Sequence, residues 1–234
     1  MTVTTVVPVE PVEPAAMGSM ASKSERQRAA GRLQLAALAS RVGPVAPAHL
    51  RSLPIAAPLG ELLPGAALAR GATVVVDGPL ASALSLALLA AASAGGEWVA
   101  VAEPDDRPGD FGALAAAEAG VALERCAVVR RVARDRWPVV VNALLEGARL
   151  VVAPVPQRLR HTDARRLVAR ARERQCILVV LGSGWPAEAA LRIHGQASRW
   201  HGLEAGEGLL MHRELLIEID SKQGHRRSWC AQAS

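Results

Sequence analysis

Five short runs of apolar residues alternate with helical segments between residues 71 and 181. The runs are rich in valine, isoleucine and leucine, and most carry no polar residue in their middle. Runs of this kind are typical of strands that are buried on both faces of a parallel sheet. We expect these strands at Thr73–Asp77, Glu97–Ala102, Arg125–Val129, Leu150–Ala153 and Ile177–Leu181.

Helical segments separate the runs, and the pattern changes only after Pro186. The helices are expected at Leu84–Ser93, Asp110–Ala119, Val139–Glu146 and Thr162–Arg174. This alternation predicts an α/β fold of three layers, with a mostly parallel sheet and helices on both faces. Two later segments, Leu191–Trp200 and Arg213–Asp220, alternate apolar and polar residues and predict a C-terminal antiparallel hairpin at the sheet edge.

Composition restricts the core and the cellular setting. Half of the 234 residues are hydrophobic but only 3% are aromatic, so the core must be aliphatic. No apolar run approaches the roughly 18 residues of a membrane span. The three cysteines form no C-x-x-C pair, which is typical of a reduced protein. We therefore expect a cytoplasmic protein without a membrane partner, associated with the nucleoid when bound to its partners.

The sequence divides into five expected parts, and the true start codon is Met1, Met17 or Met20. A Pro- and Glu-rich tail without periodicity comes first, and a capping box at Ser24 and Gln27 opens a helix. A proline-rich linker then leads into the core. The parts are a disordered tail at 1–22, a helix at 23–41, the linker at 42–62, the core at 63–220 and a flexible basic tail at 221–234.

The loop after the first expected strand, Gly78–Ser85, is either a damaged phosphate loop or a plain turn between strand and helix, as in any doubly wound protein. In a comparison with the motif G-x-x-x-x-G-K-[ST], Gly78 and Ser85 fit the first and last positions. Ala83 stands in place of the second glycine and Leu84 in place of the lysine, and Ser82 occupies the variable position before Ala83. The lysine neutralises the β- and γ-phosphates. Loss of such a charge-assisted contact costs on the order of 2–5 kcal/mol.

A second part of the nucleotide site is also missing. A P-loop NTPase needs an acidic residue at the end of a later strand to hold Mg²⁺. The corresponding strand ends at Ala153, and Pro154 follows. Two losses at one site predict a protein that is not an enzyme, with no catalytic residue and no cofactor.

The order of these segments resembles the core of RecA-type recombinases from Leu63 to Asp220, about two-thirds of the chain. The stretch LPGAALARGATVVVDGP is similar to the entry into the RecA phosphate loop, and ARLVVAPV stands where RecA has its Walker B strand. WVAVAE matches the strand that carries the catalytic glutamate of RecA, here Glu103. Without the lysine and the aspartate, Glu103 is expected to cap a helix or to meet an arginine.

Within this superfamily the chain resembles the ImuA family, especially its shortened actinobacterial ImuA-prime form. The resemblance implies a non-catalytic accessory protein of damage-induced mutagenesis and translesion DNA synthesis, in the SOS response. Its implied partners are ImuB, an inactive Y-family polymerase, and indirectly an error-prone polymerase α subunit. The alternatives are a SulA-like division inhibitor that binds FtsZ and a weak ATPase or DNA-binding RecA paralogue. Oligomeric state does not follow from the sequence.

Arginines are concentrated between residues 149 and 174. Three uses of them stay open: contact with DNA, contact with an acidic partner surface, or a solvated face. Trp185 either stacks on a base or covers the sheet edge, and the basic C-terminal tail supplies a further aromatic residue. The predicted DNA- or partner-binding residues are Arg158, Arg160, Arg165, Arg166, Arg170, Arg174, Trp185, Arg226, Arg227 and Trp229.

Histidines cluster in the expected hairpin, at His194, His201 and His212. A metal site needs three or four ligands that converge. His194 and His201 differ by an odd number of positions, so an unbroken strand would place them on opposite faces. We therefore predict no metal site.

Overall fold

A computed structural model describes residues 52–57, 59–106, 111–204, 207–221 and 224–233. All of them belong to one compact unit, Pro47–Ser234. The tail and helix expected at 1–22 and 23–41 lie outside the described residues. Among the described ranges, no helix is long and apolar enough to cross a membrane.

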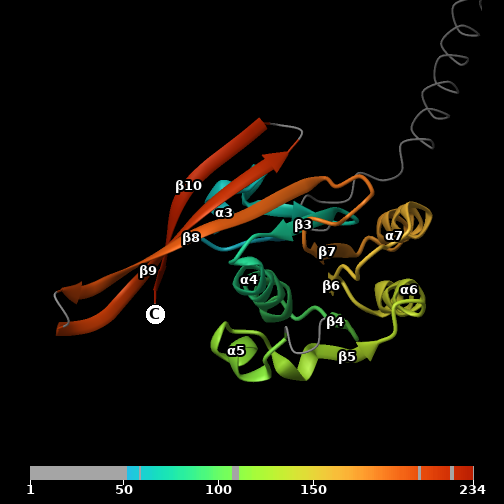
Figure 1. The fold of residues 1–234 in the computed structure, drawn as a ribbon, viewed down its shortest axis with the longest axis horizontal. Coiled ribbons are helices and arrows are strands. Elements are labelled where there is room, and N and C mark those ends of the chain that lie inside the picture. Colours follow the sequence, from blue (N-terminus) through green and yellow to red (C-terminus); the bar gives the residue numbers. More distant parts are fainter. Residues whose placement is uncertain (1–51, 58, 107–110, 205–206, 222–223, 234) are drawn as a thin grey trace, which may run out of the picture. The chain divides into compact units, whose positions relative to one another are not determined.

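The centre of the structure is a sheet of eight strands in the order β10-β9-β8-β3-β7-β6-β4-β5 (Figure 1). Strands β8, β3, β7, β6, β4 and β5 run parallel, and β9 and β10 continue the sheet antiparallel. The strands span β3 (Thr73–Asp77), β4 (Val99–Pro104), β5 (Cys126–Val132), β6 (Leu150–Pro154), β7 (Ile177–Leu181), β8 (Leu191–Glu204), β9 (Glu207–Ser221) and β10 (Gly224–Ala233).

Helices cover both faces of the parallel strands. On one face lie α3 (Leu59–Leu62), α4 (Ala81–Ala94) and α5 (Ala113–Glu118), and on the other lie α6 (Trp137–Gly147) and α7 (His161–Arg174) (Figure 1). The predicted three-layer α/β fold with a mostly parallel sheet is therefore confirmed. Successive strand residues point to opposite faces of the sheet, so the strands contribute aliphatic side chains to both cores, one under each layer of helices.

The alternation is clear in β3, whose three central valines are fully buried. Val74 and Val76 pack in the core beneath α4, whereas Val75 packs in the core beneath α6 and α7. On α7 the buried residues are Ala164, Leu167, Val168 and Ala171, as the helical spacing predicts.

The linker expected at 42–62 is partly structured. Strand β1 (Ser52–Pro54) pairs antiparallel with β2 (Ala67–Ala69), and α3 and a 3₁₀ turn (Pro64–Ala66) lie between them. The prediction of an extended linker up to residue 62 is wrong because Leu53, Ile55 and Leu59 bury their side chains in the core. Burial of each such side chain contributes about 1.5–3 kcal/mol, which outweighs the proline-rich composition.

The C-terminal segment also differs from its prediction. Residues expected as a flexible tail form β10, which pairs with β9 from Gly224 to Ala233 without a register shift. The polar sequence of β10 lacks the alternation that marks a half-buried strand, so only its pairing with β9 shows what it is.

The hairpin of β8 and β9 is longer than predicted and contains irregularities. The register shifts between Gly195 and Ala197, and again between His201 and Leu203. His194 faces Glu218 and His201 faces His212. The two histidines are seven residues apart on β8, whereas their partners are six residues apart on β9, because the first shift adds one residue to β8. The assumption of an unbroken strand, which put these two histidines on opposite faces, is therefore wrong.

Two glycines test how closely β8 packs on the loop after β3. A Cβ atom at Gly195 would lie 2.5 Å from the Cβ of Leu80, whereas a Cβ at Gly184 would meet nothing within 4 Å. We expect Gly195→Ala to lower the free energy of unfolding by about 1–3 kcal/mol through overpacking. Gly184→Ala, the matched control, should leave it unchanged or raise it by up to about 1 kcal/mol. Urea unfolding measures both, and equal effects would contradict this packing.

Candidate functional site

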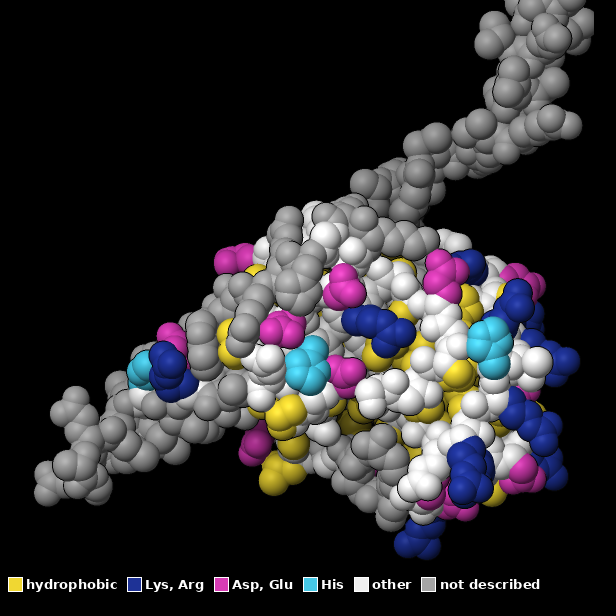
Figure 2. All heavy atoms as spheres, turned by 45° about the horizontal axis from the view of Figure 1, so that its top comes forward, with side chains coloured by type: hydrophobic (Ala, Val, Ile, Leu, Met, Phe, Trp, Pro, Cys, Tyr) yellow, Lys and Arg dark blue, Asp and Glu magenta, His cyan; other side chains and the backbone are white. Residues whose placement is uncertain are grey.

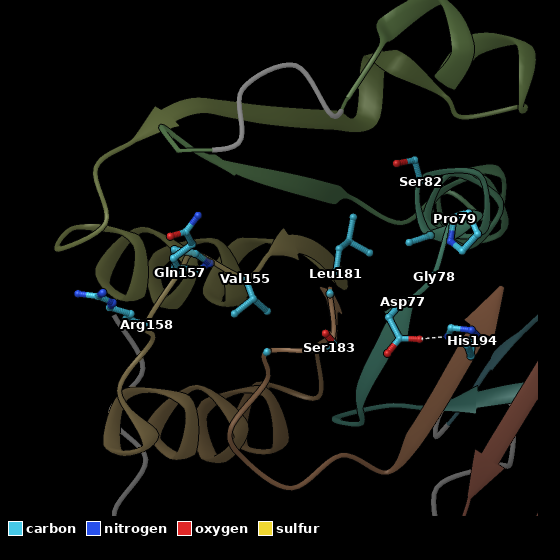
Figure 3. A pocket seen from close by; sticks show the side chains of 14 residues that line it. Asp77, Gly78, Pro79, Ser82, Val155, Gln157, Arg158, Leu181, Ser183 and His194 are labelled. Carbon is cyan, nitrogen blue, oxygen red and sulfur yellow. Dashed lines mark hydrogen bonds and ion pairs between the residues drawn. The ribbon is translucent and has the colours of Figure 1, made fainter. Parts of the chain in front are cut away.

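A cavity of about 550 Å³ lies at the carboxyl ends of β3, β6 and β7 (Figure 3). This is the edge at which open α/β sheets bind their ligands. The loop after β3, the segment after β6 and the segment after β7 form its walls. Its polar lining consists of Asp77, Ser82, Gln157, Arg158, Ser183 and His194.

The loop after β3 keeps the shape of a phosphate loop without its functional groups. Gly78 has a φ of +83°, and a Cβ there would lie 2.4 Å from the carbonyl oxygen of Gly195, so only glycine fits. Leu84, at the position of the lysine, is 2% exposed and packs in the core. The Ser85 hydroxyl is buried and donates to the Ser82 carbonyl oxygen at 2.7 Å. Neither side chain reaches the cavity.

The position expected to hold Mg²⁺ is equally apolar. Ala153 is fully buried at the end of β6, and Pro154 and Val155 follow it as buried residues. In the part of the chain that the structure describes, no group of three or more His, Cys, Asp or Glu side chains could hold a metal ion.

An aspartate and a histidine face each other at the rim of the cavity. Asp77 ends β3, and its Oδ1 lies 2.6 Å from Nδ1 of His194 on β8 (Figure 3). The two residues are register partners in the parallel ladder of β3 and β8. Sequence reasoning missed this pair because the residues are 117 positions apart and the pairing of β3 with β8 was unknown. The pair places a carboxylate where a nucleotide would carry phosphates.

Glu103 is a buried carboxylate with structural partners. It is 1% exposed, and its Oε1 accepts a hydrogen bond from the backbone N–H of Phe111 at 2.6 Å. Arg130 lies 3.6 Å from its other oxygen and donates to the Phe111 carbonyl oxygen at 3.2 Å. These contacts match the expectation that Glu103 meets an arginine and fixes the chain ahead of α5.

The predicted arginines do not form one surface. Figure 2 shows Lys and Arg side chains gathered toward the side that α6 and α7 occupy in Figure 1. Arg165, Arg166 and Arg174 are exposed on α7. Arg170 instead bridges α7 to α6, because it forms ion pairs with Glu146 and with Glu173, the latter at 2.8 Å.

Arg158 and Arg160 belong to a separate group, in the loop between β6 and α7. They line a second cavity of about 550 Å³ together with Arg134, which follows β5. Three aspartates share this lining, namely Asp105, Asp135 and Asp163. Arg134 was absent from the predicted set, since nothing in the sequence places the end of β5 beside the end of β6.

Trp185 does not belong to an exposed surface. Its side chain is 4% exposed and packs in the core beneath α6 and α7, so its ring has no face open to a base. This burial disfavours the predicted stacking of Trp185 on a base and favours the alternative, that Trp185 covers the sheet edge. The side chains of Arg226, Arg227 and Trp229 lie outside the described residues.

Known proteins match both the sequence and this architecture. The model of the MT3502 N-terminal domain family matches residues 61–187, which contain the loop, α7 and the whole lining of the cavity except His194. The chain belongs to the MT3502 N-terminal domain family. This family segment begins within α3 and ends after β7, so it contains all five parallel strands from β3 to β7.

One relative and one solved structure extend this comparison. The uncharacterized protein Rv3395c of Mycobacterium tuberculosis is 36% identical over 130 residues, which are 54% of this chain and 60% of that protein. The chain thus matches less than two-thirds of its relative's length. The crystal structure of the RadB recombinase has a TM-score of 0.54 at 15% identity and covers 73% of this chain and 91% of its own. The likeness shows that this family member has a RecA-like fold.

The bridge made by Arg170 predicts a pH-dependent stability. Hydrogen bonds from Arg170 lower the pKa of Glu146 and of Glu173 below the usual 4.5. Because these pKa values are lower in the folded chain, the bridge stabilises the fold above pH 4.5 and is lost as pH falls further. Arg170→Ala should therefore lower the Tm at pH 7, and the difference from wild type should vanish in acid.

Arg166→Ala is the matched control, since Arg166 is exposed and lies 3.9 Å from Asp163. We expect its Tm to follow that of the wild type at every pH. Thermal unfolding followed by circular dichroism measures all three proteins. A Tm difference for Arg170→Ala that persists unchanged in acid would show that the bridge is not ionic.

Proposed function

We propose that this protein is a non-catalytic, RecA-like accessory protein of damage-induced mutagenesis. In this role it binds an inactive Y-family polymerase of the ImuB type and, through that partner, acts beside an error-prone polymerase α subunit. DNA is its second ligand. The protein uses the recombinase scaffold for docking and does not hydrolyse ATP.

The observation that carries the proposal is the state of the cavity at the end of β3. Binding of a polyphosphate there needs a lysine and a carboxylate that holds Mg²⁺. Leu84 occupies the position of the lysine and Ala153 that of the carboxylate, and both are core residues. Asp77 adds a negative charge to the lining. Each change disfavours nucleotide binding by a different physical route, namely the lost cation, the lost metal ligand and like-charge repulsion.

The exposed arginines support a role in binding. Arg165, Arg166 and Arg174 lie on the solvent side of α7, and no ion pair closer than 3.9 Å engages them within the described residues. Arg174 lies in the last turn of α7, where a cation stabilises the helix, whereas Arg165 and Arg166 lie nearer its amino end and gain nothing from the helix dipole. Guanidinium groups in this arrangement suit phosphates or carboxylates of a partner.

Absence of nucleotide binding is the first test. If the protein had a nucleotide site, ATP at a hundred times its Kd would stabilise the folded state by about 2.7 kcal/mol. We expect magnesium ATP to leave the Tm unchanged, as measured by differential scanning fluorimetry against magnesium alone. A rise in Tm that saturates with ATP would contradict the non-catalytic assignment.

Partner binding is the second test. We expect the protein to co-purify with an ImuB-type polymerase, and the combined change of Arg165, Arg166 and Arg174 to alanine to weaken that complex at low salt. Trp229→Ala tests the C-terminal segment better than a truncation, which would remove β10 from the sheet. Arg192→Ala is the control, since Arg192 is exposed on β8 and is not part of α7. Recovery of FtsZ in place of the polymerase would overturn the proposal.

A further inference from the structure

Trp98 is an exposed tryptophan immediately before β4. Its side chain is 53% exposed, whereas Trp137 and Trp185 are 0% and 4% exposed. Exposure of a large indole to water is unfavourable, because its apolar surface gains free energy only when it is buried. Trp98 lies at the amino end of the parallel strands, the edge opposite to the cavity at the carboxyl ends.

Two arginines lie beside Trp98 on the neighbouring strands. Val99 is the register partner of Leu150 on β6 and of Cys126 on β5, so the residues one position earlier are Arg149, Trp98 and Arg125. The Trp98 carbonyl oxygen accepts the backbone N–H of Arg149 at 2.8 Å. Neighbouring strands are about 4.8 Å apart, so Trp98 lies between Arg149 and Arg125 in one short row of residues at the strand ends.

The charges around the ring leave an excess of cations. Arg149 and Arg70 share the carboxylate of Glu97, at 3.7 and 2.6 Å. Arg125 donates to the Gly96 carbonyl oxygen at 2.9 Å, which fixes its side chain without neutralising it. Arginines also stabilise helix carboxyl ends, which lie at this edge of the sheet. That role explains the cations, but it gives no reason for an exposed indole among them.

We infer that this row, Arg125, Trp98 and Arg149, binds single-stranded nucleic acid. An unpaired base stacks on the Trp98 ring, and the two arginines contact the adjacent phosphates. Stacking on one aromatic side chain is worth about 1–3 kcal/mol and does not depend on sequence. The inference rests on the proposed function in that DNA is the ligand, and it adds a separate site, at the edge of the sheet opposite to the cavity and outside α7.

A protein partner fits this row less well. Protein hot spots also use tryptophan and arginine, but they lie within surrounding contacts that exclude water, and exposed apolar docking patches often reach several hundred Å². The other exposed large apolar side chains of the described residues are Leu114, Leu123 and Val139. Leu114 and Val139 begin helices that follow the carboxyl ends of β4 and β5, so of these three only Leu123 lies at the amino-end edge. One ring and one leucine among arginines favour a base over a protein surface.

The test uses a fluorescein-labelled dT20 oligonucleotide and the full chain at low salt. We expect Trp98→Ala to weaken binding about 5- to 150-fold, which is the stacking free energy converted to affinity. Trp98→Phe keeps a ring and should stay close to wild type. Val139→Ala, an exposed apolar residue on α6, is the control and should not change the affinity.

Arg149→Gln provides a second, independent measurement. Loss of one phosphate contact should reduce the slope of log affinity against log salt by about 1. No binding of dT20 by the wild type, or equal affinity of wild type and Trp98→Ala, would overturn the inference. The inference would also be overturned if Trp98→Ala abolished binding of the polymerase partner and left dT20 binding unchanged, because Trp98 would then contact a protein. Loss of dT20 binding in the α7 arginine variant alone would assign the DNA to α7 and also reject this site.

Discussion

The burial of β3 on both faces is the constraint on which the rest of the structure depends. Val74 and Val76 belong to one core and Val75 to the other, and all three are fully buried. Because β7 pairs with one side of β3 and β8 with the other, β3 joins the parallel sheet to the antiparallel ribbon. The end of β3 therefore sets where Asp77, the glycine loop and the cavity lie.

This arrangement explains how a phosphate loop can lose its chemistry and keep its form. The loop is fixed by close backbone packing of Gly78 and Gly195 and by Leu80 and Leu84 in the core. None of these contacts needs a nucleotide. Replacement of a lysine that faces solvent and phosphate by a leucine that faces the core adds buried apolar area to the fold, so stability does not oppose the loss of the site.

The sequence predicts the parallel strands well and their partners poorly. The ranges of β3 and β7 match the prediction residue for residue, because short apolar runs can only be buried strands here. The pair of Asp77 and His194, the approach of Arg134 to Arg158 and the pairing of β10 all depend on which strands are neighbours. Local patterns carry no such information, and polar strands such as β10 lack even the local pattern.

The positions of the arginines in the sequence also fail to predict where the protein carries positive charge on its surface. Counted along the chain, the arginines between residues 149 and 174 form one strongly basic segment. In space, Arg170 pairs with Glu146 of α6 and with Glu173 of its own helix, and Arg149 shares Glu97 with Arg70 at the opposite end of the strands from Arg158. Each carboxylate neutralises one cation, so Arg170 with its two acids has no charge left for a phosphate, whereas Arg149 and Arg70 with one shared acid keep one positive charge between them. Basic surfaces among the described residues are therefore defined by where arginines outnumber their acidic neighbours, and that depends on the packing of strands and helices rather than on arginine spacing.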